Sequence, residues 1–394
     1  MRETMRPVPF HDPDITEAEL KAVEQVLRSG WLTTGMVAEA FETEFAAAVG
    51  AGAAVALSSC TAALHVALCL RDLGPEDEII VPTLTFTATA AVVPQAGARL
   101  VLADIDPRTG NLDLAAADRL VRDGRTRGVI WVHFGGNPTG FAECLTWATS
   151  RGLWVLEDAA HALSARIGGI PVGGLTTQAA FSFYPTKPLT TGEGGMLTFP
   201  EGTDPAIIAR ARRLTLHGID QDAYQRSRRG VYHYEVLEDG YKYNLPDVLA
   251  AIGRAQLPRW QQARLARSAI ARCYTEAFRQ IPGIRLLEVD PHVESAWHLY
   301  VIGVPDALPR DAVAEQLRAR EVRASVHYRP LHLHRYYRDL WFSSARGGEI
   351  QPRFPGAEDF YRTCLSLPIF VGMTAVDVDR VVDAVRDVCA GGGR

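Results

Sequence analysis

Residues 153–161 read Leu153-Trp154-Val155-Leu156-Glu157-Asp158-Ala159-Ala160-His161. An apolar run without alternation is typical of a strand that is buried on both faces of a parallel sheet. The run ends abruptly in two acids, and ligands of open α/β sheets bind beyond the carboxyl ends of the strands. The segment therefore predicts a buried parallel strand with Asp158 at its ligand-binding end.

Similar short apolar runs precede and follow this strand, and amphipathic stretches lie between them. Strands are predicted at residues 53–57, 78–82, 99–104, 129–134, 153–158, 179–184 and 195–199, and helices at 61–72, 85–95, 113–122 and 141–150. Alternation of strands with helices is typical of a mainly parallel sheet that is covered on both faces. We therefore predict an α/β fold around a seven-stranded sheet.

The pattern changes after Pro246, where a long helical stretch is predicted to run to about residue 280. Strands are predicted beyond it at 297–304 and 322–328, helices at 309–320, 356–364 and 374–389, and a polar loop at 343–355. We predict a large domain with an N-terminal arm over residues 1–250 and a smaller α+β C-terminal domain over residues 251–394.

Composition argues against several classes of protein. The net charge is -5 without a basic block, so neither nucleic acid nor an anionic membrane surface is an expected partner. No apolar run approaches the ~20 residues of a membrane span, and the N-terminus lacks the apolar stretch of a signal peptide. The six cysteines are scattered without C-x-x-C spacing, which fits reduced thiols and no metal site. A cytoplasmic protein is expected.

Lysine is nearly absent from the chain. The only lysines are Lys21, Lys187 and Lys242, among 41 Lys and Arg residues. Lys187 lies in the run Ser182-Phe183-Tyr184-Pro185-Thr186-Lys187-Pro188-Leu189-Thr190-Thr191-Gly192-Glu193-Gly194-Gly195. Arginine replaces lysine as a surface charge but cannot form a Schiff base. Lys187 is therefore a candidate for covalent catalysis, and a residual surface lysine is the alternative.

Further candidates follow other predicted strands. Ser58-Ser59-Cys60-Thr61-Ala62 opens a helix and predicts a phosphate site on free amides, or an ordinary N-cap. Asp158 could keep a pyridine nitrogen protonated, or cap a helix. Phe86 could stack on a flat ring or belong to the core. His161 could contact the same ligand or be a half-buried structural histidine, and Ser182 could bind phosphate or a neighbouring backbone group. Together these residues supply what pyridoxal phosphate (PLP) requires.

The chain also resembles the PLP-dependent sugar aminotransferases of the DegT/StrS group, which have fold type I. The resemblance runs nearly end to end. Its more specific motifs are Ser58-Ser59-Cys60-Thr61-Ala62-Ala63-Leu64, Glu157-Asp158-Ala159-Ala160-His161, the Lys187 run, Gly240-Tyr241-Lys242-Tyr243-Asn244-Leu245, Trp297-His298-Leu299-Tyr300 and Arg329-Pro330-Leu331-His332.

The resemblance implies a role for each cofactor residue. Lys187 would form the Schiff base and shuttle the proton, Asp158 would pair with the pyridine nitrogen, and Phe86 and His161 would lie against the ring. The phosphate would be held by Ser182, Thr61, the amide of Ala62 and the segment at Cys60. A residue of a neighbouring subunit completes this site in the family; Asn244 is its best match, although relatives often carry Asn at the position of Lys242. A homodimer is implied.

The implied reaction moves an amino group from L-glutamate, which becomes 2-oxoglutarate, to a nucleotide-linked keto sugar, with PLP and pyridoxamine phosphate alternating. We predict amination at C-4 of a 4-keto-6-deoxy sugar carried on dTDP, in deoxyamino-sugar biosynthesis for a secondary metabolite. The expected substrate-binding residues are Tyr184, His133, Thr34 and His327. A C-3 keto-sugar or amino-cyclitol aminotransferase is the alternative, and a non-catalytic regulatory relative is a third reading. A pyridoxamine-dependent dehydratase is disfavoured because that branch replaces the lysine with histidine.

Overall fold

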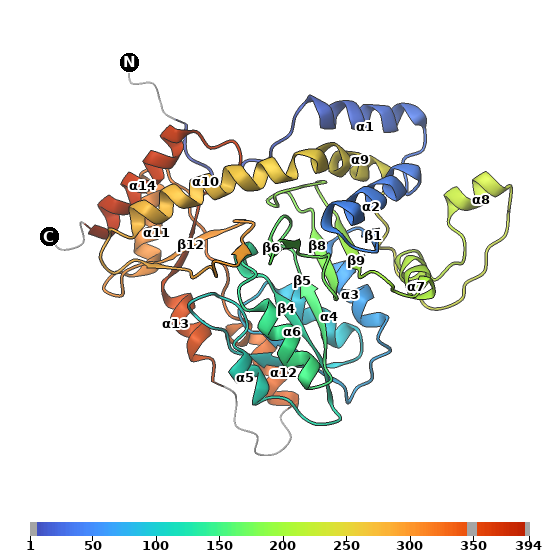
Figure 1. The fold of residues 1–394 in the computed structure, drawn as a ribbon, viewed down its shortest axis with the longest axis horizontal. Helices are drawn as coiled ribbons and strands as arrows, with labels where there is room; N and C mark the ends of the chain where they lie inside the picture. The colour runs from blue at the N-terminus through green and yellow to red at the C-terminus, as the bar shows by residue number, and fades with distance from the viewer. Residues whose placement is uncertain (1–5, 345–352, 391–394) are drawn as a thin grey trace.

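The computed structural model describes residues 6–344 and 353–390. Its centre is a seven-stranded sheet with the strand order β1-β9-β8-β5-β4-β2-β3 (Figure 1). The strands are β1 (Ala53–Leu57), β2 (Glu78–Pro82), β3 (Arg99–Ala103), β4 (Thr126–Val132), β5 (Trp154–Asp158), β8 (Gln178–Ser182) and β9 (Gly195–Phe199). Only β9 is antiparallel to its neighbours in this sheet, so the predicted α/β fold with a mainly parallel sheet is confirmed.

Helices cover both faces of the large sheet. On one face, α3 (Cys60–Cys69) and α4 (Thr87–Gln95) pack against a core that includes Leu156 of β5. On the other face, α6 (Phe141–Ser150) packs against a core that includes Val155, and α2 (Met36–Val49) packs against a second core that includes Ala56 and Phe181. Because successive side chains of a strand point to opposite faces, Asp158 lies on the α3 face and Glu157 on the α6 face.

The helix predicted over residues 246–280 is broken in the structure. It is divided into α9 (Asp247–Gln256), a 3-10 turn (Leu257–Arg259) and α10 (Trp260–Phe278). Pro258 lies in this turn, and proline can neither donate a backbone hydrogen bond nor fit the interior of an α-helix. The α10 helix then carries the chain away from the large sheet (Figure 1).

A second, smaller sheet follows in the C-terminal part. It pairs β10 (Arg285–Leu286), β12 (Tyr300–Gly303) and β13 (Cys364–Leu367) antiparallel, and α10, α11 (Arg310–Ala319) and α14 (Ala375–Ala390) share its apolar core. The strand predicted at 322–328 is wrong, because this segment makes only isolated bridges, to Val8 and to Ser366. The predicted domain boundary at residue 250 falls within α9, and the division into two domains stays a prediction.

The remaining elements lie at the edges of this framework. They are α1 (Glu17–Ser29), α5 (Leu114–Asp118), α7 (Pro205–Thr215), α8 (Ala223–Arg229), α12 (Arg335–Ser344), α13 (Pro355–Thr363), and the small strands β6 (Arg166–Ile167), β7 (Ile170–Pro171) and β11 (Val293–Glu294). The α8 helix extends away from the body of the molecule (Figure 1). Most of the predicted loop at 343–355 lies outside the described residues. Among the described helices, none is both long and apolar enough to cross a membrane.

Candidate active site

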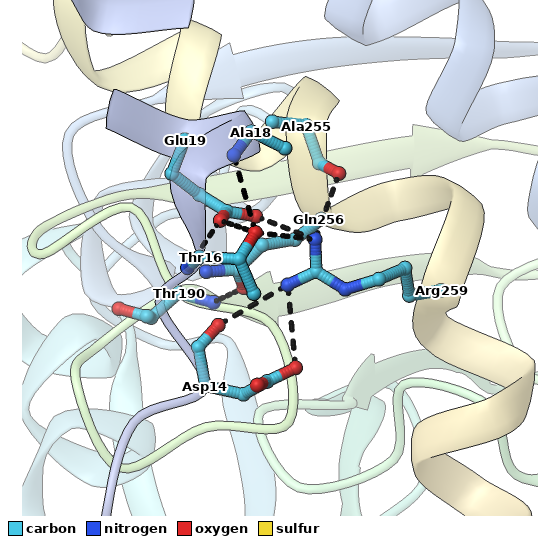
Figure 2. Close-up of polar contacts among 8 residues, drawn as sticks. All are labelled: Asp14, Thr16, Ala18, Glu19, Thr190, Ala255, Gln256 and Arg259. Carbon is cyan, nitrogen blue, oxygen red and sulfur yellow. Dashed lines mark hydrogen bonds and ion pairs between the residues drawn. The ribbon is translucent and has the colours of Figure 1, made fainter. Parts of the chain in front are cut away.

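The loop that carries Lys187 connects the antiparallel strands β8 and β9. Its two ends are joined because the Phe183 amide donates to the Gly194 carbonyl at 2.9 Å, and the Thr191 amide donates to the Phe183 carbonyl at 3.0 Å. The side-chain oxygen of Gln256 in α9 accepts from the Thr190 amide at 2.9 Å (Figure 2). The backbone around Lys187 is thus fixed from both strands and from a neighbouring helix.

Arg259 holds the N-terminal segment close to this loop. Its guanidinium forms ion pairs with Asp14 at 3.2 Å and with Glu19 at 2.9 Å (Figure 2). Glu19 also accepts from the Thr16 amide at 2.7 Å, which completes the capping box of α1. Residues far apart in the sequence therefore converge beside the Lys187 loop.

The amine of Lys187 lies in a largely desolvated place. Burial lowers its pKa to about 8, and the nearby Cys60 and Asp158 act in the opposite direction. A lysine with a lowered pKa holds a larger share of the free amine at neutral pH, and the free amine is the nucleophilic form. The structure thus brings together Lys187 and Asp158, the two candidates on which the predicted chemistry depends most.

Asp158 is 6% exposed and has a defined set of donors. The Thr89 hydroxyl donates to its Oδ2 at 2.7 Å, and the Ala160 amide donates to its Oδ1 at 3.2 Å. Burial raises the pKa of this carboxyl, because none of these neutral donors compensates for lost water as a cation would. Sequence reasoning missed Thr89, since nothing in the sequence relates a threonine of α4 to an acid 69 residues later.

The predicted phosphate-binding segment lies at the start of α3, directly against β9. A Cβ on Gly195 would stand 2.4 Å from the carbonyl carbon of Ser59 and 2.5 Å from the Cys60 nitrogen, so only glycine fits there. The Cys60 thiol is buried, 3.4 Å from the Ala180 carbonyl. The Ala62 amide donates to Ser59 Oγ at 3.1 Å, so a phosphate would have to share or replace that contact.

Ser182 and Thr61 also lie at this end of the sheet. Ser182 is the last residue of β8, and it pairs with Gly195 of β9. Its hydroxyl oxygen accepts a long bond of 3.4 Å from the Tyr184 amide. Thr61 is half-buried in the first turn of α3, where unpaired helix amides favour an anion.

A group of aromatic side chains and histidines includes Phe86 and His161, the two residues predicted to lie against the cofactor ring. Phe86 is 57% exposed although it follows a buried strand, and its ring centroid lies 6.0 Å from that of Tyr328. His161 is buried, with its ring centroid 4.4 Å from His298. Burial holds the pKa of His161 well below its usual value, and the nearby Lys187 lowers it further. Phe86 and His161 both contact the ring of Tyr328, and such a group of aromatic rings suits a flat ligand.

Asn244 and Thr34 are joined to each other. The Asn244 amide donates to Thr34 Oγ1 at 2.7 Å, and Thr34 donates to the Leu245 carbonyl at 2.7 Å. Lys242 contacts the side-chain oxygen of Asn244. A backbone bridge places Asn244 next to Leu57, immediately before the predicted phosphate-binding segment.

The structure does not bring His133 to the site. Its side chain is completely buried, its Nε2 lies 2.8 Å from Glu157 Oε2, and its ring contacts Trp131 and Phe141. Because the residues of β4 alternate, His133 belongs with Trp131 on the α6 face, opposite Asp158. The expectation that His133 contacts the sugar is therefore corrected. The prediction placed His133 in the site because of its motif and did not consider which face of the sheet its side chain would occupy.

Tyr184 and His327 remain available as substrate residues. The Tyr184 side chain is 48% exposed and lies three residues before Lys187. His327 is half-buried, its Nδ1 lies 2.8 Å from Ser366 Oγ, and burial lowers its pKa to about 4. Their roles toward a substrate stay predictions.

These residues fit PLP. Asp158 is a buried carboxyl for which the described part of the chain supplies no cationic partner at hydrogen-bond distance, and a protonated ring nitrogen would be such a partner. The tight contact at Gly195 lets β9 pack directly against the start of α3, and Phe86 offers a solvent-exposed ring. Lys187 would provide the amine to which the cofactor is attached.

Known proteins match this chain over almost its full length. The sequence pattern of the DegT/DnrJ/EryC1/StrS aminotransferase family matches residues 13–386. The spore coat polysaccharide biosynthesis protein SpsC of Bacillus subtilis is 41% identical over 98% of this chain and 97% of its own length. The UDP-4-amino-4-deoxy-L-arabinose–oxoglutarate aminotransferase of Shewanella sediminis is 34% identical over 97% of this chain and 98% of its own.

Solved structures match it equally well. The putative sugar aminotransferase Spr1654 of Streptococcus pneumoniae superposes in its PLP form with a TM-score of 0.88 and 28% identity, covering 97% of this chain and 98% of that one. Its PMP form gives a TM-score of 0.88 and 29% identity over 97% and 99% of the two chains. The fold, the catalytic class and the cofactor follow from these matches together.

Proposed function

This chain belongs to the DegT/DnrJ/EryC1/StrS aminotransferase family, and we propose that it transfers an amino group from L-glutamate to C-4 of a nucleotide-linked 4-keto-6-deoxy sugar. It is a PLP-dependent sugar aminotransferase. The observation that supports the chemistry is that Lys187 and the buried carboxyl of Asp158, beyond the carboxyl ends of β8 and β5, are near enough for each to shift the pKa of the other.

The residues have separate tasks in this reaction. PLP, when bound, supplies an electron sink and stores the amino group between the two half-reactions. The Lys187 amine accepts and returns the proton of the substrate carbon, because its lowered pKa lets it act in both directions near neutral pH. Asp158 favours a positive charge on the ring nitrogen, Phe86 covers one face of the ring, and Ser182 with the first turn of α3 holds the phosphate.

The name of a relative supports the position of amination, and the orientation of the sugar in the site would determine it. The Shewanella sediminis protein has a name that specifies a 4-amino-4-deoxy sugar and oxoglutarate. Because Lys187 and the cofactor site are fixed, the orientation of the sugar must decide which carbon reacts. The side chains of Tyr184, His327 and Thr34 are the residues we assign to that orientation, and dTDP is the nucleotide we propose.

A direct assay tests the position of amination. With L-glutamate as donor, dTDP-4-keto-6-deoxyglucose is expected to be aminated at C-4, with the product identified by NMR. The 3-keto isomer is expected to react at least about 100-fold more slowly, because its ketone would lie outside reach of the Lys187 amine. Amination of the 3-keto sugar alone would replace the proposal with the C-3 alternative. A UDP-linked 4-keto sugar in the same panel tests the preference for the nucleotide independently of the position of amination.

We also propose that the enzyme acts as a two-fold homodimer with Asn244 and the Trp31–Gly35 loop at a site shared between subunits. Residues beside α8 support this proposal, because they expose apolar and aromatic side chains away from the body of the chain. These are Val231, Tyr232, Tyr234, Val236 and Leu237, with Tyr232 at 87% exposure. Such a patch on a soluble enzyme usually marks a protein contact.

Subunit mixing tests this arrangement. Lys187→Ala and Asn244→Ala subunits, each weakly active alone, are expected to regain activity when they are unfolded together and refolded as a mixture. Half of the randomly formed dimers are mixed and each has one intact site, so roughly a quarter of wild-type activity is expected. A fully active monomer, or a mixture no more active than the sum of its parts, would exclude the shared site.

A further inference from the structure

The glycine turn after β4 presents a backbone amide to the active-site histidine. Gly135 has φ 62° and Gly136 has φ 88°, which is the left-handed region that glycine tolerates best. A Cβ on Gly136 would stand 2.6 Å from the His161 carbonyl oxygen, so the turn lies directly against His161. In this position the Gly135 amide donates to His161 Nδ1 at 3.3 Å.

This contact determines which nitrogen of His161 carries the proton. A neutral imidazole has one donor and one acceptor nitrogen. Burial, together with the charge of Lys187, keeps the pKa of His161 well below its usual value, so the ring is neutral at physiological pH. Since a backbone amide can only donate, Nδ1 must be the acceptor. The proton of His161 is therefore on Nε2.

The position of the proton on His161 determines how the Tyr328 hydroxyl is hydrogen-bonded. Its hydroxyl oxygen lies 3.1 Å from His161 Nε2, and because Nε2 carries the proton, the Tyr328 oxygen accepts this hydrogen bond. The proton of the Tyr328 hydroxyl is then unused, since residues 6–344 and 353–390 offer it no acceptor. Burial and the nearby Asp158 raise the pKa of Tyr328 well above its usual value, so the hydroxyl keeps its proton.

The position of this free donor is informative. The Tyr328 ring lies 6.1 Å from His161 in a stacked arrangement and 6.0 Å from the exposed ring of Phe86. Both neighbours belong to the site that fits the cofactor ring. A half-buried hydroxyl with an unused proton costs free energy unless a ligand or water accepts from it.

We propose that Tyr328 is a further ligand-binding residue of this site: its hydroxyl donates a hydrogen bond to an oxygen of the bound ligand, while the His161 ring donates to the hydroxyl. Two oxygens have the required chemistry, the phenolic oxygen attached to the cofactor ring and the ketone oxygen of the sugar. The proposal rests on the PLP-dependent reaction and not on which carbon of the sugar is aminated.

The first test determines the tautomer of His161 without any variant of Tyr328. The full-length enzyme is prepared with ¹⁵N-labelled histidine, with and without PLP, and His161 is assigned from a His161→Asn sample. A bare and a protonated imidazole nitrogen have well-separated ¹⁵N shifts, and His161 is expected to be protonated at Nε2. A proton on Nδ1 would overturn the proposal, because Tyr328 would then have to donate to His161.

The second test distinguishes the two oxygens with Tyr328→Phe. Its matched control is Tyr300→Phe, which removes a buried hydroxyl that bonds Thr275 at 2.9 Å in the small sheet, outside the site. If the cofactor oxygen is the acceptor, the visible absorption band of PLP-loaded Tyr328→Phe should titrate with its midpoint moved by roughly half a pH unit or more. If the ketone oxygen is the acceptor, the band should be unchanged.

In the second case, the reaction of pyridoxamine-phosphate-loaded enzyme with the keto sugar should be about tenfold slower, as expected for one lost hydrogen bond. Tyr300→Phe should match the wild type in both measurements. If neither the band nor this half-reaction differs from the control, Tyr328 does not bind the ligand. The NMR and absorption measurements need no sugar, so failure of the C-4 assignment would be seen separately.

Discussion

Lys187→Ala is expected to abolish transamination, with a loss of more than about 10⁴-fold, because the variant lacks both the attachment point of the cofactor and the general base. It should still bind pyridoxamine phosphate, since the phosphate and ring contacts come from other residues. Borohydride reduction of the PLP-loaded wild type should join the cofactor permanently to a peptide that contains Lys187, which mass spectrometry identifies.

The scarcity of lysine makes this experiment unusually clean. Lys21 on the exposed side of α1 provides a matched control, and Lys21→Ala should keep full activity. The lowered pKa of Lys187 adds a second readout, because only the free amine attacks PLP: the rate of attachment to the unloaded enzyme should rise with pH up to about 8 and then level off. Labelling at Lys21 or Lys242 would show that the assignment is wrong.

Asp158→Asn is expected to reduce turnover by about 10³-fold while the protein folds normally. A neutral amide cannot stabilise a positive charge on the ring nitrogen as a carboxylate does, and interactions of this kind are worth several kcal/mol in a buried site. The donors around Oδ1 and Oδ2 are the Ala160 amide, the Cys60 thiol and the Thr89 hydroxyl, and the hydroxyl can rotate to accept from the new amide. Steady-state kinetics with saturating PLP measures the loss.

Thermal unfolding separates this loss from damage to the fold. Because burial raises the pKa of Asp158, its folded pKa exceeds the unfolded one, and its ionisation at neutral pH disfavours the unloaded fold. The unloaded variant should therefore be at least as stable as the wild type, but gain less from added PLP. Asp104→Asn, which alters another buried acid, bonded to the Gly356 and Ala357 amides, should lose stability and retain turnover per folded molecule. Wild-type turnover in Asp158→Asn would show that another residue pairs with the ring nitrogen.

The large sheet could be predicted from the sequence because its strands have a local signature. Runs such as residues 153–156 are apolar throughout, and each of the seven predicted strands is present within three residues at either end. The antiparallel direction of β9 was not predictable from its own residues, since it depends on the short return after the Lys187 loop. Pro258 marks the break in the sequence, but the helix-forming residues on both sides of it led to the prediction of one continuous helix.

The site was only partly predictable for a related reason. Lys187 and Asp158 stand out as candidates in the sequence because rare or charged residues near strand ends form a local signal. Thr89 and the Gly135 amide act through hydrogen bonds to residues distant in the sequence, which no local pattern encodes. The alternation of side chains along β4 explains why His133 was misplaced. A histidine one residue beyond a strand still follows that alternation, and here its side chain points to the face of the sheet opposite Asp158.

The joined ends of the β8–β9 loop have a consequence for the way two unlike substrates share one base. The Lys187 backbone is tied at Phe183, Thr190 and Thr191, so its amine can travel only along the arc that four side-chain bonds allow. Because the backbone is held in place, the side chain of Lys187 alone sets how far the base can reach. Each substrate must therefore place its reacting carbon within the same arc, so the rest of the sugar substrate has to be accommodated on the side away from Lys187.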